Sequence, residues 1–143
     1  MPAYPSVIPM IAYEDCAMAI AWLEKAFGFS ERKDARYTEK DGTITHAEMQ
    51  AGDGLIMLAT PTPDYQSPLH HREHCAEAKQ WSSVPYVIDG VMVYLDDVEQ
   101  QYELAKKAGA RMLSELERSE HGTRYRVEDL EGHRWMFMQR EKE

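Results

Sequence analysis

A faint internal repeat constrains the fold of this chain more than any other feature of its sequence. With an offset of 81 positions, five residues of the first half fall on identical residues of the second: Tyr13 on Tyr94, Asp15 on Asp96, Leu23 on Leu104, Lys25 on Lys106 and Gly28 on Gly109. A second alignment, offset by 78, places His46 on Arg124, Glu48 on Arg126 and Gly54 on Gly132. We therefore predict two copies of one structural unit, with intervening loops of different length.

Each copy predicts the same order of elements. An apolar strand (residues 8–13 or 91–95) is followed by an acidic residue suited to cap a helix, and the helix that follows ends before Gly28 or Gly109. The first helix is expected to run through Phe27 after Asp15, and the second through residue 108 after residues 96 and 97, which are both Asp. Three short strands separated by glycine turns then complete a β-α-β-β-β module.

The 143 residues suit a single domain with one core. We expect one domain over residues 1–143, with module one at about 5–60, a linker at about 61–85 and module two at about 86–140. The linker holds four of the seven prolines, and a helical turn or two is expected around residues 70–80.

Charge and cysteine content exclude several classes of protein. The formal charge of −9 repels a phosphate backbone, so no nucleic-acid partner is expected. No apolar run approaches the roughly 20 residues that cross a bilayer, and no membrane partner is expected either. Two cysteines are too few for a disulfide framework, so we expect reduced thiols and a cytoplasmic protein.

Three segments resemble a known superfamily: AYEDCAMAIAWLEKAFGF at residues 12–29, THAEMQAGDGLIMLA at 45–59 and RYRVEDLEGHRWMFM at 124–138. They resemble the vicinal-oxygen-chelate proteins, which include glyoxalases, extradiol dioxygenases and bleomycin-resistance proteins, and in particular uncharacterised glyoxalase-like members. The resemblance implies an α+β fold of two βαβββ modules that form a curved mixed sheet around a cleft. It also implies a homodimer whose paired modules assemble across subunits.

The resemblance implies metal ligands at four strand positions, which fall here at Ile8, Leu58 (or Met57), Gly90 and Met136. Alkyl and thioether groups are poor ligands for hard divalent ions. We therefore expect no metal, no cofactor and neither glyoxalase nor extradiol dioxygenase activity of the metal-dependent kind.

Alternation along the strands predicts which side chains line the pocket, while Trp135 and Phe137 are expected in the core. The candidate ligand-binding residues are Met10, His46, Glu48, Met92, Tyr94, Arg124, Arg126 and Met136. If they point inward, His46 and Glu48 oppose two arginines across the cavity and can orient a carboxylate or transfer protons. If they point outward, these charges form a solvated cross-strand pattern.

Two further groups of residues have alternative interpretations. His133 either joins His46 and Glu48 in a displaced metal site or is satisfied by nearby backbone. The linker residues His70, His71, His74 and Cys75 have helical spacing that could hold zinc or copper, or they form a solvated polar turn.

Three functions follow. The first is binding of a small, largely apolar organic molecule in a metal-free pocket between the modules, as in resistance-type proteins. The alternative is a lyase, isomerase or dioxygenase-type enzyme in which His46 or Glu48 is a general base, or which uses a displaced metal site. The third is a non-catalytic module whose cleft binds a peptide or another chain.

Overall fold

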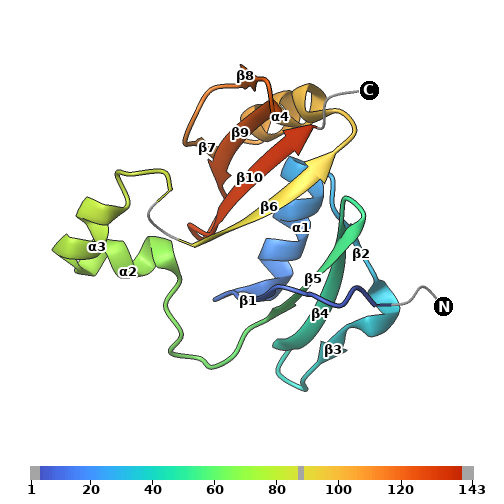
Figure 1. Ribbon diagram of the computed structural model, residues 1–143. Coiled ribbons are helices and arrows are strands. Elements are labelled where there is room, and N and C mark those ends of the chain that lie inside the picture. Colours follow the sequence, from blue (N-terminus) through green and yellow to red (C-terminus); the bar gives the residue numbers. More distant parts are fainter. Residues whose placement is uncertain (1–3, 87–88, 140–143) are drawn as a thin grey trace.

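A computed structural model describes residues 4–86 and 89–139, which form two mixed β-sheets with helices packed between and beside them (Figure 1). The first module consists of β1 (Met10–Ala12), α1 (Cys16–Phe27), β2 (Ser30–Glu31), the short 3-10 helix η1 (Lys33–Ala35), β3 (Tyr37–Thr38), β4 (Ile44–Ala51) and β5 (Gly54–Ala59). The second consists of β6 (Gly90–Leu95), α4 (Val98–Lys107), β7 (Arg111–Met112), β8 (Glu117–Ser119), β9 (Gly122–Glu128) and β10 (Arg134–Gln139). The α+β fold of two similar modules is therefore confirmed.

Each sheet contains one more strand than the sequence predicted. The order is β1-β5-β4-β2 in the first sheet and β6-β10-β9-β7 in the second, and the additional strands β3 and β8 pair with β4 and β9. In each module the chain after the helix pairs with one long strand in two short pieces. In module one, η1 and a register shift between Tyr37 and Thr38 separate these pieces. In module two, the backbone N–H groups of Leu113 and Ser114 both turn toward the carbonyl oxygen of Arg126.

Both long helices begin and end at the predicted signals. The Asp15 carboxylate accepts a hydrogen bond from the backbone N–H of Met18 at 3.0 Å, and Gly28 ends α1 with φ of 73°. In the second module it is Asp97 that accepts, from the N–H of Gln100 at 3.0 Å. The caps are therefore 82 positions apart rather than 81, and pairing Asp15 with Asp96 is wrong by one residue.

The one-residue difference changes which side chains are equivalent. Tyr13 is fully buried, whereas Tyr94 is 40% exposed on the opposite face of its sheet. Since neighbouring residues of a strand point to opposite faces, the identity of these two tyrosines does not reflect an equivalent position.

Helix α1 lies between the two sheets, so both modules share one hydrophobic core (Figure 1). Phe27 at the end of α1 packs edge-on against Trp135 and Phe137 of β10, with ring centroids 5.7 and 4.8 Å away. Phe29 contacts Trp135 in the same way at 5.4 Å. Trp135 and Phe137 are therefore core residues, as predicted.

The connection between the modules contains the two helices α2 (Pro68–His74) and α3 (Ala76–Trp81), which project to one side of the sheets (Figure 1). They occupy the region where a helical turn or two was predicted. Ser67 caps α2 by accepting from the N–H of His70 at 3.2 Å, and Pro68 occupies its first turn, where no N–H is needed. Within residues 4–86 and 89–139, no helix has the length and apolar character needed to cross a membrane.

Candidate functional site

The face of each sheet that points away from the shared core, here called its open face, carries an equivalent row of three residues. Strand pairing aligns Met10 with Met57 and Met57 with Glu48 in the first sheet. In the second sheet it aligns Met92 with Met136 and Met136 with Arg126. Directly paired residues point to the same face. Each open face therefore has two methionines and one ionisable residue in a row.

This register corrects one predicted metal-ligand position. Leu58 is only 1% exposed and packs in the core, so it faces away from the row, and its neighbour Met57 occupies the open face. Ile8 and Gly90 precede Met10 and Met92 by two residues and follow the same alternation. The positions at which the resemblance implies metal ligands therefore hold alkyl groups, thioethers and a glycine, and they do not fit a hard divalent ion.

On the open face of the first sheet, Glu48 is buried among polar partners. Its carboxylate is within 2.8 Å of Nε2 of His46 and 3.3 Å of a guanidinium nitrogen of Arg32. The hydroxyl of Tyr4 donates to it at 3.1 Å. Glu48 is 3% exposed, whereas the His46 side chain is 34% exposed. The pair thus presents a solvent-accessible imidazole supported by a buried, fully partnered carboxylate.

On the open face of the second sheet, Glu128 is the centre of a buried ionic cluster. Arg134 donates to it through Nε at 3.1 Å, Arg72 of α2 donates at 2.8 Å and Arg111 at 3.3 Å. Burial alone would raise the pKa of the Glu128 carboxyl, but the hydrogen bond from Arg72 and the three positive charges lower it below its ordinary value. Glu128 is therefore an ionised anchor for this part of the molecule.

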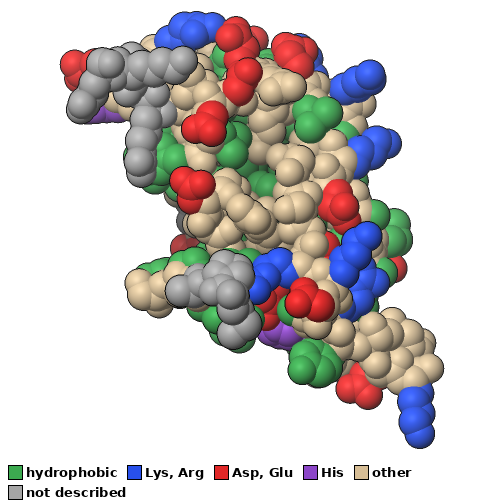
Figure 2. Space-filling view, turned by 90° about the vertical axis from the view of Figure 1, so that its right-hand side faces the viewer, with side chains coloured by type: hydrophobic (Ala, Val, Ile, Leu, Met, Phe, Trp, Pro, Cys, Tyr) green, Lys and Arg blue, Asp and Glu red, His purple; other side chains and the backbone are tan. Residues whose placement is uncertain are grey.

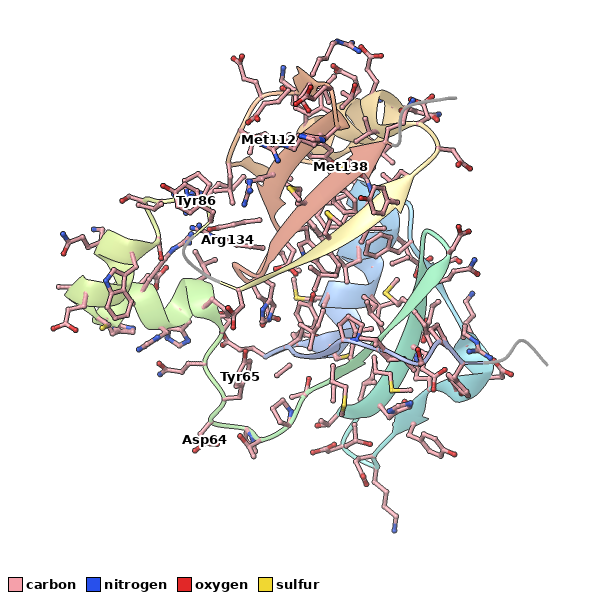
Figure 3. All side chains as sticks on the ribbon, viewed as in Figure 1. Asp64, Tyr65, Tyr86, Met112, Arg134 and Met138 are labelled. Carbon is pink, nitrogen blue, oxygen red and sulfur yellow. The ribbon has the colours of Figure 1, made fainter. Side chains whose placement is uncertain are left out.

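Arg134 also holds the linker in place. Its guanidinium donates to the backbone carbonyls of Ser82 and Val84 at 2.5 and 2.7 Å. In Figure 3 this side chain lies at the start of β10, near the segment that carries Tyr86, while Met138 lies toward the other end of the strand. The sequence did not reveal this role of Arg134, because its partners are as many as 52 positions away.

The two predicted arginines of β9 have different surroundings. Arg124 is within 3.4 Å of the Glu117 carboxylate. Among the described residues, the Arg126 guanidinium has neither a hydrogen bond nor an ion pair. The backbone of Arg126 is bonded instead: its N–H donates to the hydroxyl of Ser114, and its carbonyl oxygen accepts from the N–H groups of Leu113 and Ser114. Arg126 is half-buried, so its charge is partly shielded from water, and no described residue pairs with it.

Two hollows adjoin these faces. The larger, called the inter-module groove, measures about 760 Å³ and lies between the β4–β5 hairpin, the segment before β1 and the strand β6. It is lined by Val7, Pro9, Ala51, Asp53, Gly54, Leu55, Ile56, Val91, Met92, Val93, Tyr94, Leu95, Asp96 and Gln139. The smaller, called the Arg126 cavity, measures about 240 Å³ and is lined by Pro85, Tyr86, Asp89, Gly90, Val91, Met92, Leu113, Arg126, Arg134, Trp135 and Met136.

These hollows bring together only part of the predicted pocket. Met92 borders both of them, Tyr94 lines the groove, and Arg126 and Met136 line the cavity. The remaining candidates lie on open faces outside these two linings: Met10, His46 and Glu48 on the first sheet and Arg124 on the second.

The turn before β10 contains His133 and places its imidazole beside the backbone of Ala12. Nε2 of His133 is 2.7 Å from the carbonyl oxygen of Ala12, which agrees with the interpretation that nearby backbone satisfies this residue. The same turn contains Asp129, whose buried carboxylate accepts from the Tyr13 hydroxyl at 2.6 Å and from Nε1 of Trp135 at 3.1 Å. Burial raises the pKa of the Asp129 carboxyl. Burial, together with the neighbouring Asp129 carboxylate, raises the pKa of the Tyr13 hydroxyl well above its ordinary value. This turn therefore joins module two to the start of α1.

The linker histidines form no cluster of metal ligands. The rings of His70 and His74 are 5.2 Å apart, and Nδ1 of His70 is 3.4 Å from the Glu14 carboxylate. In the part of the chain that the structure describes, no three His, Cys, Asp or Glu side chains are placed so that they could hold a metal ion. Neither the linker site nor a displaced site at His46, Glu48 and His133 is present in this arrangement.

The family model of the "Glyoxalase/Bleomycin resistance protein/Dioxygenase superfamily" matches residues 7–137, which is nearly the whole chain. The protein belongs to this superfamily. An uncharacterised superfamily relative, protein Mb0911c of Mycobacterium bovis, is 29% identical over 140 residues, covering 94% of this chain and 83% of its own.

Solved structures support the same conclusion for the fold. TioX from Micromonospora sp. ML1 superimposes with a TM-score of 0.67 at 27% identity, covering 97% of this chain and 98% of its own. A bleomycin-binding protein complexed with bleomycin superimposes with a TM-score of 0.62 at 18% identity, covering 96% and 99%. This superfamily member therefore has the bleomycin-resistance fold over nearly its whole length.

Proposed function

We propose that the protein binds a small, largely apolar organic molecule in the inter-module groove and the adjoining Arg126 cavity, without a metal ion. The observation that carries this proposal is the exposure of Met92 and Tyr94, 46% and 40%, where β6 borders a groove of about 760 Å³. Concave sites lined by apolar and aromatic side chains with a few polar groups are typical of small-molecule binding. Methionine adapts its shape to irregular ligands.

The structural relatives support this proposal. One protein of the same fold has been solved as a complex with bleomycin, so the architecture is able to hold a small organic molecule. The side chains at the implied metal-ligand positions support a metal-independent mode of binding, because methionine at Met57 and Met136 is a poor ligand for hard cations. The function is then sequestration or transport of the bound compound.

The test is native mass spectrometry with elemental analysis of protein purified without chelator or metal-affinity resin. The expected result is a retained organic mass and less than one equivalent of any divalent metal per chain. One tightly held divalent ion per chain would contradict the metal-free mechanism.

We also propose that the functional unit is a homodimer. The open faces of both sheets carry large exposed side chains, Met10 at 82% on the first sheet and Met92 at 46% on the second. A twofold dimer that places the first sheet of one chain opposite the second sheet of its partner covers both of these exposed faces. Multi-angle light scattering should give twice the monomer mass, and a monomer at all concentrations would refute this arrangement.

The second candidate function is an enzyme of the lyase or isomerase type. The observation in its favour is the contact of 2.8 Å between His46 and the buried Glu48 carboxylate, with the imidazole accessible to solvent. A carboxylate that orients an imidazole is a common arrangement for a general base. Arg32, 3.3 Å from the same carboxylate, keeps positive charge beside the pair.

A direct probe of this candidate is deuterium exchange at the methyl group of pyruvate, followed by proton NMR in D2O. General-base activity predicts exchange above the buffer rate that is lost in Glu48→Gln and retained in the exposed control Glu117→Gln. Equal exchange in both variants would remove Glu48 from the mechanism.

A further inference from the structure

The Arg126 cavity contains a positive charge that no group among residues 4–86 and 89–139 neutralises. Among the described residues, the guanidinium of Arg126 makes no hydrogen bond or ion pair, although the side chain is half-buried. The residues that follow it across the sheet are Met136 and Met92, which offer no acceptor of comparable strength. A partly buried cation costs free energy unless it is paired, so the cavity favours a ligand that brings an anion.

The equivalent row of the first sheet shows how the chain neutralises such a charge where it needs no ligand. There the ionisable residue is Glu48, and its carboxylate has Arg32, His46 and Tyr4 as partners. The second sheet retains the two methionines, but within the part of the chain that the structure describes no carboxylate pairs with Arg126. The difference between the two rows singles out the second sheet as the place for an anionic ligand.

The charges around the cavity are mainly positive, which also favours an anionic ligand. Arg126 and Arg134 line it together with Asp89, and Arg134 belongs to the cluster in which Glu128 accepts from Arg72 and Arg111 as well. Among the described residues, the cavity lining and the Glu128 cluster beside it together contain four guanidinium groups and two carboxylates. This is a local surplus of two positive charges in a chain whose formal charge is −9.

Arg134 is not itself available to a ligand. It is 4% exposed, and its nitrogens donate to Glu128, Ser82 and Val84. Asp89, also on the lining, is exposed and forms no ion pair with Arg126. Its carboxylate oxygens therefore lie farther than 4.0 Å from the Arg126 nitrogens. Arg126 is therefore the group that an entering anion meets.

We propose that the Arg126 cavity binds the carboxylate of a compact amphipathic acid, with the guanidinium of Arg126 pairing with the carboxylate and Met92, Met136 and Leu113 holding its apolar body. The planar fork of arginine matches a carboxylate with two parallel hydrogen bonds. The volume of the cavity, about 240 Å³, limits the size of the ligand group that can enter it. This inference rests on the proposed function and specifies the chemical class of its ligand.

The test uses three probes of the same shape and different charge: 1-naphthoate, 1-naphthalenemethanol and 1-naphthylmethylammonium. Protein labelled with 13C at the methionine methyl groups is titrated with each probe by NMR, and the signals of Met92 and Met136 are assigned through Met→Leu substitutions. The Met136 signal reports binding inside the cavity, whereas Met92 borders both the cavity and the inter-module groove. Dissociation constants are measured for the native protein, for Arg126→Met and for the control Arg118→Met, which removes the same charge from an exposed position that is ion-paired with Glu99.

The expected result is that the native protein binds naphthoate more tightly than the alcohol and the ammonium compound. Arg126→Met should weaken naphthoate binding about ten- to a hundredfold, as expected for loss of a charge-assisted hydrogen bond, and leave the alcohol unchanged. Arg118→Met should change naphthoate binding by less than about threefold, because exposed charges are screened.

Equal affinity for the acid and the alcohol, or unchanged naphthoate binding in Arg126→Met, would overturn the inference. In that case binding of the alcohol would still support the proposed function. Absence of methyl shifts with all three probes would also overturn the inference, and a lack of retained ligand in native mass spectrometry would then remove the proposed function as well.

Discussion

Replacing Glu128 by Gln should destabilise the protein severely, although the two side chains have nearly the same shape. The carboxylate is 1% exposed and accepts from Arg134, Arg72 and Arg111. Neutralising it leaves the buried guanidinium of Arg134, whose side chain is 3% exposed, without a counter-charge. Removing one partner of a buried ion pair typically costs about 3–5 kcal/mol, and we expect a loss of that size here.

The three arginines should differ in importance according to their exposure. Arg111→Met should cost less than about 1 kcal/mol, because its side chain is 51% exposed and the pair is screened by water. Arg72→Met should have an intermediate cost, because the Arg72 side chain is 12% exposed. Arg134→Met should destabilise the protein nearly as much as Glu128→Gln. Urea denaturation followed by tryptophan fluorescence, to which the buried Trp135 contributes together with Trp22 and Trp81, gives each free energy of unfolding. A Glu128→Gln cost below about 1 kcal/mol, or a cost for Arg111→Met as large as that for Arg134→Met, would refute this reasoning.

The same variant has a defined pH dependence. The three arginines lower the pKa of Glu128 in the folded protein, against the effect of burial. A carboxyl with a lowered folded pKa stabilises the fold above its unfolded pKa, and this contribution is lost as pH falls through the folded value. The stability difference between native protein and Glu128→Gln should therefore be constant at neutral pH and shrink below about pH 4.5.

Two further predictions concern single residues. Burial raises the pKa of the Cys16 thiol to about 12. Ellman's reagent at pH 8 should therefore modify the half-buried Cys75 in the native protein and reach Cys16 only after unfolding. Rapid modification of both thiols would contradict the packing of Cys16. Gly132→Ala should destabilise the protein more than Gly28→Ala in calorimetry. Both glycines have positive φ, a conformation that costs a residue with a side chain about 1 kcal/mol. Only at Gly132 would the added Cβ also lie 2.7 Å from the backbone of α2. Equal destabilisation by the two substitutions would argue against this contact.

The helices could be predicted from the sequence because their signals are local. Asp15 and Gly28 lie next to the helix that they bound, and each acts through hydrogen bonds or backbone conformation within a few residues. The two modules followed from these signals because they recur in the same order. The short strands β3 and β8 could not be predicted, because two or three residues form a strand only if a partner such as β4 or β9 lies beside them.

The candidate site was predicted less completely, and the reasons are physical. Counting along the chain placed Leu58 at a metal-ligand position, but a shift of one residue moves a side chain to the other face of a sheet. The partners of Glu128 come from positions as many as 56 residues away, and no sequence pattern links them. Among the described residues Arg124 is ion-paired and Arg126 is not, and this difference also depends on the geometry of β8 and β9.

The position of α1 between both sheets affects how the molecule unfolds. Because Phe27 packs against Trp135 and Phe137, and its carbonyl accepts from the Gln101 side chain of α4, either half of the chain on its own would leave aromatic surface in water. The repeated halves have thus lost the independence expected of stacked repeats, and loosening one of them weakens the other. A destabilising change in the linker or in β10 is consequently felt across the entire molecule as a single cooperative transition.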